Sequence, residues 1–263
     1  MSEVRSAGHL NPGSDSVVFD RFDIGLPDLV RHVWAVRWTL PPGTVKPQRV
    51  LTYPSFNVVF YPESVLLHGP ERRAVTQELS GSSWVVGILC RPAAAALLTT
   101  TPLTELIGAH EPVAGAPMRA IADAMRDPAS ARDTTTEILR TWLAPLDDAV
   151  TDAGRLVNRA CRIAEERDDI IRTADLALEL NVSTRSLERL IKDHTGFTPK
   201  WLIECRRMQK AATTLFAEPS TSLADLAAGL GFADHAHFTR RYREIIGETP
   251  EQTRSAVRPS PSH

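Results

Sequence analysis

The sequence predicts an α+β protein, with a β-rich N-terminal part and an all-α C-terminal part. Three short segments rich in β-branched and aromatic residues, separated by turn residues, predict the β-rich part. An internal repeat of helical character occupies the C-terminal part. At 263 residues the chain is longer than one average domain, so two domains are expected.

The β-rich part is predicted from alternation and from turn signals. Residues 32–38 place large aromatic side chains at alternate positions, and residues 56–61 and 84–89 are rich in valine, isoleucine and aromatic residues. Proline- and glycine-containing turns separate them, and several short strands at this spacing favour a barrel or a sandwich. Residues 92–109 and 116–145 are rich in alanine and leucine and predict helices.

These changes in composition and residue pattern divide the chain into segments. We expect a flexible leader over residues 1–16, a β-rich domain with C-terminal helices over 17–148, a helical domain over 152–256 and a tail over 257–263. The hinge between the two domains is expected at residues 145–148.

Composition excludes several classes of protein. No apolar run approaches the roughly 18 residues of a membrane span, and the polar start of the chain lacks the apolar core of a secretory signal. The three cysteines are far apart, so we expect neither a disulfide framework nor a metal site, and the chain fits a reducing cytoplasm. Residues 1–150 hold 13 basic and 16 acidic residues, whereas residues 183–258 hold 12 and 9. This modest asymmetry places positive charge at the C-terminal end.

The repeat is the most informative feature of the chain. Residues 174–181 match residues 224–231 at an offset of 50, and after a turn the match resumes at an offset of 51. The later matches are Leu187 with Phe238, Arg189 with Arg240, Lys192 with Arg243, Gly196 with Gly247 and Pro199 with Pro250. One extra residue in the second turn accounts for the change in offset.

Each copy has the features of a helix-turn-helix unit. A short helix carries a small alanine, and four residues later Asn181 or Gly231 suits the left-handed backbone of a tight turn. Ser183 or Asp234 then supplies an N-cap for the next helix. That helix ends at a glycine, with a proline shortly after it.

A single helix from Pro199 to about Phe216 is expected to join the two units. At 1.5 Å per residue it is roughly 27 Å long, close to the ~34 Å turn of B-DNA. Such a spacer would hold two recognition helices in successive major grooves. Double-stranded DNA with a bipartite, asymmetric site and half-sites about 10 base pairs apart is therefore the expected partner.

Residues 154–256 resemble the DNA-binding domain of the AraC/XylS family. The motifs that carry the resemblance are Leu176-Ala177, Ser183-x-Arg185-Ser186-Leu187-x-Arg189, Gly196-Phe197-x-Pro199, Arg207-Met208-x-x-Ala211, and Leu226-Ala227-x-x-x-Gly231-Phe232 through His237-Phe238-x-Arg240. Leu89-Cys90-Arg91-Pro92-Ala93 and the strand–helix order are similar to the sensory β-domains of some members. The resemblance implies a cupin-like barrel or sandwich that senses an effector and dimerises.

Helical spacing selects the candidate base-reading residues. These are Arg185, Glu188 and Arg189 on the first recognition helix and His235, Ala236, Thr239 and Arg240 on the second, positions that face bases in the family that the chain resembles. Arginine reads guanine through two hydrogen bonds, and a glutamate can accept from a cytosine amino group. Glu188 could equally pair with Arg185 or Lys192. Candidate phosphate contacts are Ser186, Lys192, Lys200, Arg207, Arg241 and Arg243.

Two questions about the first domain stay open at this level. Its aromatic residues could line an apolar effector pocket or simply form the core, and the candidates are Trp34, Trp38, Tyr53, Phe56, Phe60 and Trp84. The domain could also serve only for dimerisation. The sequence does not distinguish an activator, which would contact RNA polymerase, from a repressor.

An enzyme is the rival class. The chain has neither a glycine-rich phosphate loop nor a Gly-x-Ser-x-Gly motif, and Cys161 and Cys205 lie on apolar helix faces. A DNA-repair methyltransferase would need a reactive cysteine in a Pro-Cys-His-Arg setting, which Cys90-Arg91-Pro92 does not provide. We therefore expect no cofactor and no catalytic residue.

Overall fold

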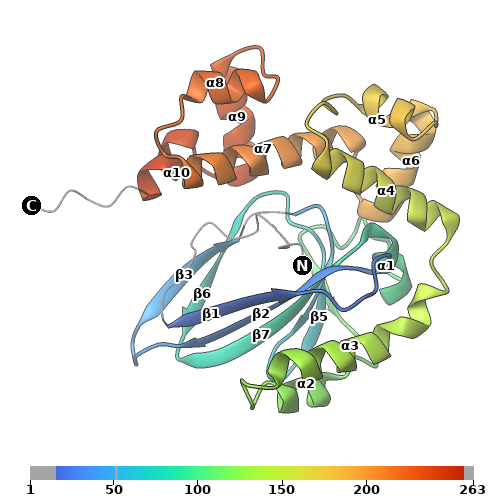
Figure 1. Cartoon of the computed structure of the whole chain (residues 1–263), viewed down its shortest axis with the longest axis vertical. Helices are drawn as coiled ribbons and strands as arrows, with labels where there is room; N and C mark the ends of the chain where they lie inside the picture. Colours follow the sequence, from blue (N-terminus) through green and yellow to red (C-terminus); the bar gives the residue numbers. More distant parts are fainter. Residues whose placement is uncertain (1–15, 51–52, 258–263) are drawn as a thin grey trace, which may run out of the picture.

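The computed structural model describes residues 16–50 and 53–257 (Figure 1). The predicted leader and tail lie almost wholly outside these residues. The α+β class is confirmed: a β-rich part with helices precedes an all-α part. The strands are β1 (Val17–Phe22), β2 (Val30–Thr39), β3 (Val45–Val50), β4 (Asn57–Phe60), β5 (Val65–His68), β6 (Val75–Ser80), β7 (Ser82–Cys90) and β8 (His110–Pro112). The helices are α1 (Pro92–Leu98), α2 (Met118–Ala124), α3 (Ala131–Asp147), α4 (Asp152–Glu166), α5 (Thr173–Glu179), α6 (Thr184–Thr195), α7 (Pro199–Ala217), α8 (Leu223–Gly229), α9 (His235–Ile246) and α10 (Pro250–Val257).

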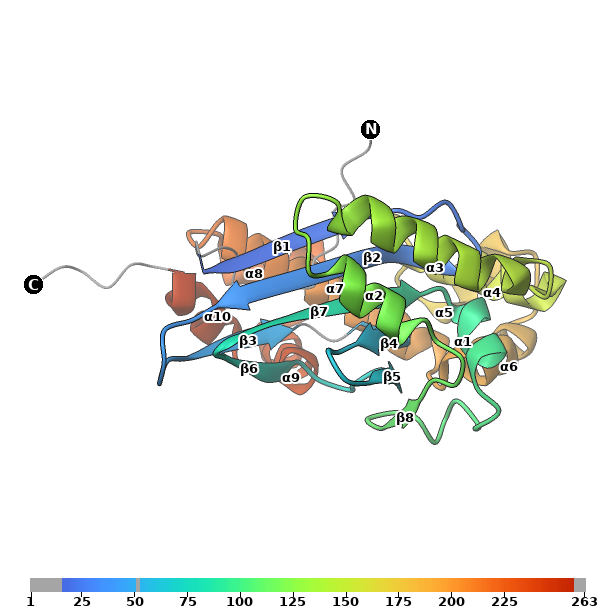
Figure 2. The same ribbon diagram turned by 90° about the horizontal axis from the view of Figure 1, so that it is seen from below.

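The described strands form two antiparallel sheets and do not close into a barrel. Six strands pair in the order β1-β2-β7-β4-β5-β8, and β3 pairs with β6 as a separate ribbon. Helices α2 and α3 cover one face of the larger sheet, whereas the C-terminal helices lie beyond its other face (Figures 1 and 2). The core under α2 and α3 contains fully buried Val33, Phe60, Ile88, Ile121 and Leu139. Each side chain comes from the inward-facing positions of its strand or helix.

The helix expected over residues 92–109 ends at Leu98, so the prediction is wrong for residues 99–109. The Thr99 hydroxyl accepts a hydrogen bond from the Thr101 amide at 2.9 Å, which offers the backbone an alternative to the helix. Pro102 then disfavours helical backbone at the residue before it. The chain instead turns back and forms β8, which pairs with β5 and which the sequence analysis missed.

The expected helix over residues 116–145 is two helices, α2 and α3. Asp127 breaks it, because its side chain accepts from the Ala129 amide at 3.1 Å and Pro128 follows directly. Pro145, where we expected the hinge to begin, lies inside α3. Only residues 148–151 connect α3 to α4.

The repeat forms two helix-turn-helix units with the predicted caps. Ser183 accepts from the Ser186 amide at 3.1 Å and Asp234 from the His237 amide at 2.6 Å, so each caps its recognition helix. Asn181 and Gly231 adopt the left-handed backbone that the turns require, with φ of 54° and 73°. Gly196 and Gly247 end α6 and α9 in the same conformation.

Helix α7 joins the units and contributes to the core of each. Its N-terminal part supplies Leu202 and Ile203 to the core of the first unit. Its C-terminal part supplies Met208, Ala211 and Leu215 to the core of the second. The predicted linker helix is therefore confirmed, and the packing at both ends fixes the orientation of each unit on a 19-residue rod.

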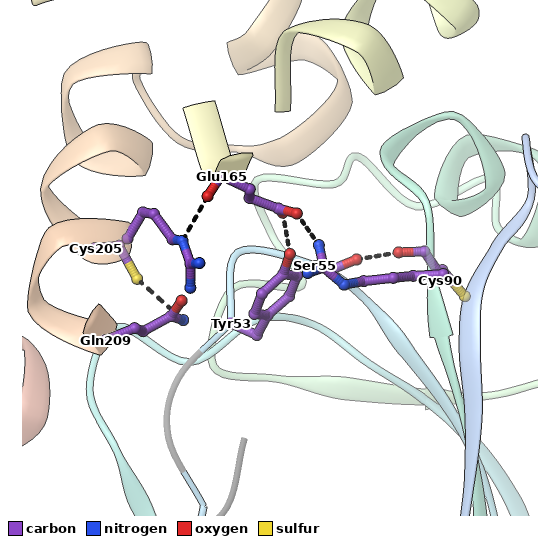
Figure 3. A network of polar contacts seen from close by, with 8 residues as sticks. Tyr53, Ser55, Cys90, Glu165, Cys205 and Gln209 are labelled. Atoms are coloured by element: carbon purple, nitrogen blue, oxygen red, sulfur yellow. Dashed lines mark hydrogen bonds and ion pairs between the residues drawn. The ribbon is translucent and has the colours of Figure 1, made fainter. Parts of the chain in front are cut away.

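A polar cluster around Glu165, at the end of α4, connects the β-rich part to the helical part (Figure 3). The Glu165 carboxylate accepts hydrogen bonds from the Arg31 guanidinium on β2 and from the Tyr53 hydroxyl. Its carbonyl oxygen accepts from Arg206 Nε on α7 at 2.8 Å. Burial raises the pKa of the Glu165 carboxyl, and the charges of Arg31, Arg91 and Arg206 oppose that rise.

Two further contacts fix the same junction. The buried side chain of Asn158 on α4 accepts from the Ala93 amide at 3.0 Å and donates to the Asp28 carbonyl at 2.8 Å. Ile107, in the loop before β8, packs against the end of α6. A Cβ at Gly196 would lie 2.7 Å from Ile107 Cδ1, so a larger residue would displace the Ile107 side chain, and the left-handed backbone at Gly196 (φ 75°) also favours glycine.

We expect replacement of Glu165 by alanine to destabilise the protein by about 3 kcal/mol, because removal of one partner leaves the Arg31 charge largely buried and unpaired. The matched control is Glu166→Ala, which removes an exposed carboxylate one residue away and should change the free energy of unfolding by less than about 0.5 kcal/mol. Urea unfolding followed by tryptophan fluorescence measures both. Equal values for the two variants would contradict a role for Glu165 at the junction.

Candidate DNA-binding interface

Helix α6 presents an exposed polar face. Arg185, Glu188 and Arg189 are exposed, whereas Leu187 and Ile191 are fully buried on the opposite side. The helix period places these three polar residues together because the buried positions fix its rotation. Within the described part of the chain, no ion pair joins Glu188 to a neighbouring cation. Its carboxylate is therefore available to an external donor.

Helix α9 presents the equivalent face of the second unit. His235, Ala236 and Arg240 are exposed, and Thr239 is half-buried. Among the described atoms, the hydroxyl of Thr239 is buried and lacks a hydrogen-bond partner. On the reverse side, fully buried Phe238 and Tyr242 hold the helix in place. The matched arginines of the repeat, Arg189 and Arg240, thus both point to solvent.

The candidate phosphate-contacting residues divide into two groups. Ser186, Lys192, Lys200 and Arg243 are exposed and lie on α6, α7 or α9. Arg241 is instead half-buried and forms ion pairs with Glu204 and Glu244. Arg207 Nε donates to the Leu230 carbonyl at 2.7 Å, and its guanidinium lies 4.1 Å from the centre of the Phe232 ring. These two arginines therefore hold the second unit together in this structure.

An open cleft of about 820 Å³ runs along the exposed face of α9. His235, Thr239, Arg240 and Arg243 line one wall. The other wall comes from the loop between β5 and β6 and carries Arg72 and Arg73. Sequence analysis missed these two arginines because they belong to the β-rich part, and no local pattern links them to α9.

The six candidate pocket aromatics do not surround one space. Phe56, Phe60 and Trp84 pack into the core beneath α2 and α3. Trp34 and Trp38 lie at alternate positions of β2 that point to the other face of the sheet. The Trp34 ring packs over Gly87, where a Cβ would lie 2.0 Å from it, and Trp38 Nε1 donates to the Ser80 carbonyl. Tyr53 belongs to the Glu165 cluster.

The cysteines are buried in the cores, as predicted for Cys161 and Cys205. Burial raises the pKa of the Cys90 thiol to about 12, and it raises the pKa values of the other two thiols. Thiols in this state are poor nucleophiles at neutral pH. The described residues contain no group of three or more His, Cys, Asp or Glu side chains that could hold a metal ion. Nor does any described helix combine the length and apolarity of a membrane span.

Two family models match parts of the chain. Residues 176–256 match a family described as a helix-turn-helix domain, which covers the second helix-turn-helix unit and nearly all of the first. Residues 23–112 match a family described as a domain of unknown function, which covers most of the β-rich part.

Solved structures that are similar to parts or most of the chain include a domain of a response regulator and ToxT. The C-terminal domain of AraT from Geobacillus stearothermophilus is 24% identical, covers 43% of this chain and 94% of its own, and has a TM-score of 0.38. ToxT from Vibrio cholerae O395, bound to (E)-4-(8-methylnaphthalen-1-yl)but-3-enoic acid, is 12% identical, covers 93% of this chain and 100% of its own, and has a TM-score of 0.44.

Curated relatives match part of the chain. The transcriptional activator RhaS from Escherichia fergusonii is 31% identical over 107 residues, which are 41% of this chain and 38% of that protein. The XylDLEGF operon transcriptional activator of Pseudomonas putida is 35% identical over 31% of this chain and 25% of its own length. The chain thus spans less than two-fifths of either relative.

Both relatives are named as regulators of transcription rather than as enzymes, as the sequence analysis expected of this chain. The family model at residues 176–256 spans α7, the second capped helix-turn-helix unit and nearly all of the first. The motifs quoted from the sequence lie at the caps, turns and recognition helices of these units. The helical part of the chain thus contains a helix-turn-helix domain of the AraC/XylS type.

Proposed function

We propose that the chain regulates transcription by binding double-stranded DNA at a specific sequence. The observation that carries the proposal is the matched construction of the two units. Each holds a capped recognition helix whose exposed face carries an arginine at the same position of the repeat, Arg189 or Arg240. An exposed arginine near the start of a recognition helix suits guanine in the major groove.

The proposed DNA site is bipartite. Helix α7 is about 28 Å long at 1.5 Å per residue, and its two ends are embedded in the cores of the two units. Figure 2 supports the proposal, since α6 and α9 lie on the same side of α7. Two helices held in this way suit successive major grooves on one face of the duplex, about 10 base pairs apart.

The proposed site is also asymmetric. The face of α6 offers Arg185, Glu188 and Arg189, three charged groups that discriminate between bases. The face of α9 offers His235, Ala236, Thr239 and Arg240, of which Ala236 contributes only a methyl group. We therefore propose that the half-site under α6 is specified more strongly than the half-site under α9.

Selection of duplexes from a randomised pool by the purified full chain tests the site directly. We expect an enriched sequence with two conserved blocks centred about 10 base pairs apart, the longer block under α6. Footprinting on the enriched duplex should protect one face of the DNA. Absence of any enriched sequence, with binding equal for all duplexes, would refute sequence-specific regulation.

Arg189→Ala and Arg240→Ala should each weaken binding to the selected duplex by about 1–3 kcal/mol, because each removes two hydrogen bonds to a base. Each variant should relax the base preference in a different half-site. Arg126→Ala is the control, since it removes an exposed arginine just after α2, which lies on the far side of the β-rich part. Fluorescence anisotropy measures the affinities. Equal losses for all sequences would make both arginines phosphate contacts instead.

We further propose that the first domain controls DNA binding, in the cytoplasm, through a small effector or through homodimerisation. The support is its direct attachment to both units: Ile107 packs against the end of α6, and the Ala74 amide donates to the Ile245 carbonyl in α9 at 3.1 Å. A change in the first domain would therefore reach both recognition helices. An activator would in addition contact RNA polymerase, and a repressor would not need to.

A thermal-shift screen combined with sedimentation distinguishes the two forms of control. An effector-binding domain should raise the melting temperature of the protein with one chemical class of metabolite, because ligand that binds only the folded state stabilises it. A domain that only dimerises should show a concentration-dependent dimer and no shift with any metabolite. A monomer without any shift would contradict both forms.

A further inference from the structure

The loop between β5 and β6 extends from the β-rich part to the second recognition helix. We name residues 69–74 the arginine arm, after Arg72 and Arg73. Both arginines are exposed, and in the described part of the chain neither forms an ion pair with an acidic residue. They stand across an open cleft from the residues of α9 that we propose to contact DNA.

The arm is held firmly at its base. The Gly69 amide donates to the Ala109 carbonyl at 2.9 Å, and the Gly108 amide donates to the Pro70 carbonyl at 3.2 Å. A Cβ at Gly69 would lie 1.6 Å from the carbonyl oxygen of Leu106, so the two segments pack backbone to backbone at a position where only glycine fits. The arm therefore starts from a fixed position on the first domain.

The tip of the arm is attached to the helical domain. Ala74 donates its amide to the Ile245 carbonyl of α9 and packs against the core of the second unit. The Arg72 guanidinium lies 5.6 Å from the centre of the Phe197 ring, which is itself stacked on Trp201 at 3.8 Å. These contacts fix the arm beside α9, with the guanidinium groups at the edge of the cleft.

Charge determines what the cleft would accept. Arg72 and Arg73 on one wall face Arg240 and Arg243 on the other, and Glu244 is the acidic residue in the lining. Glu244 is already paired with Arg241. Four arginines around an open cleft suit a polyanion, and guanidinium groups bind phosphate through paired hydrogen bonds.

We propose that the arginine arm binds the sugar-phosphate backbone of the DNA duplex beside the second recognition helix. A helix in the major groove has a phosphate strand on either side, because the groove is only about 12 Å wide. The cleft between α9 and the arm is where one of these strands would pass. Part of the DNA interface then belongs to the first domain. This inference rests on the proposed function and adds a second source of phosphate contacts to it.

The test compares the full-length Arg72→Ala/Arg73→Ala variant with the unmodified protein on the selected duplex. Each lost phosphate contact lowers the slope of log affinity against log salt concentration by about one, so we expect a decrease of up to about two. Affinity at low salt should fall several-fold for specific and nonspecific duplexes alike, since phosphate contacts carry no sequence information. The base preference should not change.

Two controls make the result specific to the arm. Arg119→Ala/Arg126→Ala removes the same charge from exposed positions on and just after α2, on the opposite side of the β-rich part, and should leave the salt slope unchanged. Arg72→Lys/Arg73→Lys should retain most of the affinity, because lysine also binds phosphate. Arg73→Ala alone, which leaves the contact between Arg72 and Phe197 intact, should show about half of the effect without loss of thermal stability.

The outcomes separate this inference from the function on which it rests. Unchanged affinity and slope would refute the arm as a phosphate contact while leaving Arg189 and Arg240 as base readers. Tighter binding by the variant would also refute it and would show that the arm shields α9 from DNA. If the unmodified protein binds no duplex, the proposed function itself fails first.

Discussion

One largely buried carboxylate, that of Glu165, is the centre of the polar cluster that connects the two halves of the molecule. It lies at the end of α4, where the helical part begins, and it binds Arg31 from the sheet while its carbonyl accepts from Arg206 on α7. An ion pair in such a place stabilises little in total, because both charges lose water. The ion pair does restrict how the sheet and the helical part can be arranged, since a carboxylate withdrawn from water needs its partners at fixed positions. Together with the apolar packing of α7, the cluster helps to fix the position of this helix relative to the sheet.

The sequence predicted the DNA-binding part in detail because its signals are local. N-caps such as Ser183 and Asp234, and left-handed turn residues such as Asn181, act within three or four residues of themselves. Because the unit is repeated, each of these caps and turns is indicated twice in the sequence. Exposure of Arg189 and Arg240 followed from the helix period, once the buried positions Leu187 and Phe238 had been recognised.

The sequence did not predict features that depend on long-range contacts. Strand β8 has only three residues and forms because β5 lies beside it, and the helix expected there ends at a hydrogen bond of Thr99. For the same reason the sequence left open whether the aromatic candidates of the first domain line a pocket or form the core. Strand register places Trp34 on one face of the sheet and Trp84 on the other, and no pattern within one strand reveals which face is covered.

The two helix-turn-helix units differ in two respects. Sequence alone distinguishes them by their side chains, of which α6 carries the more discriminating set. In the folded chain they differ as well in their relation to the first domain. Ile107 contacts α6 at its end, away from the exposed face, whereas Arg72 and Arg73 line the same cleft as the exposed face of α9. A movement of the first domain would therefore alter the surroundings of α9 more than those of α6. The unit for which we propose the weaker sequence specificity is thus the better placed of the two to transmit the proposed control by the first domain.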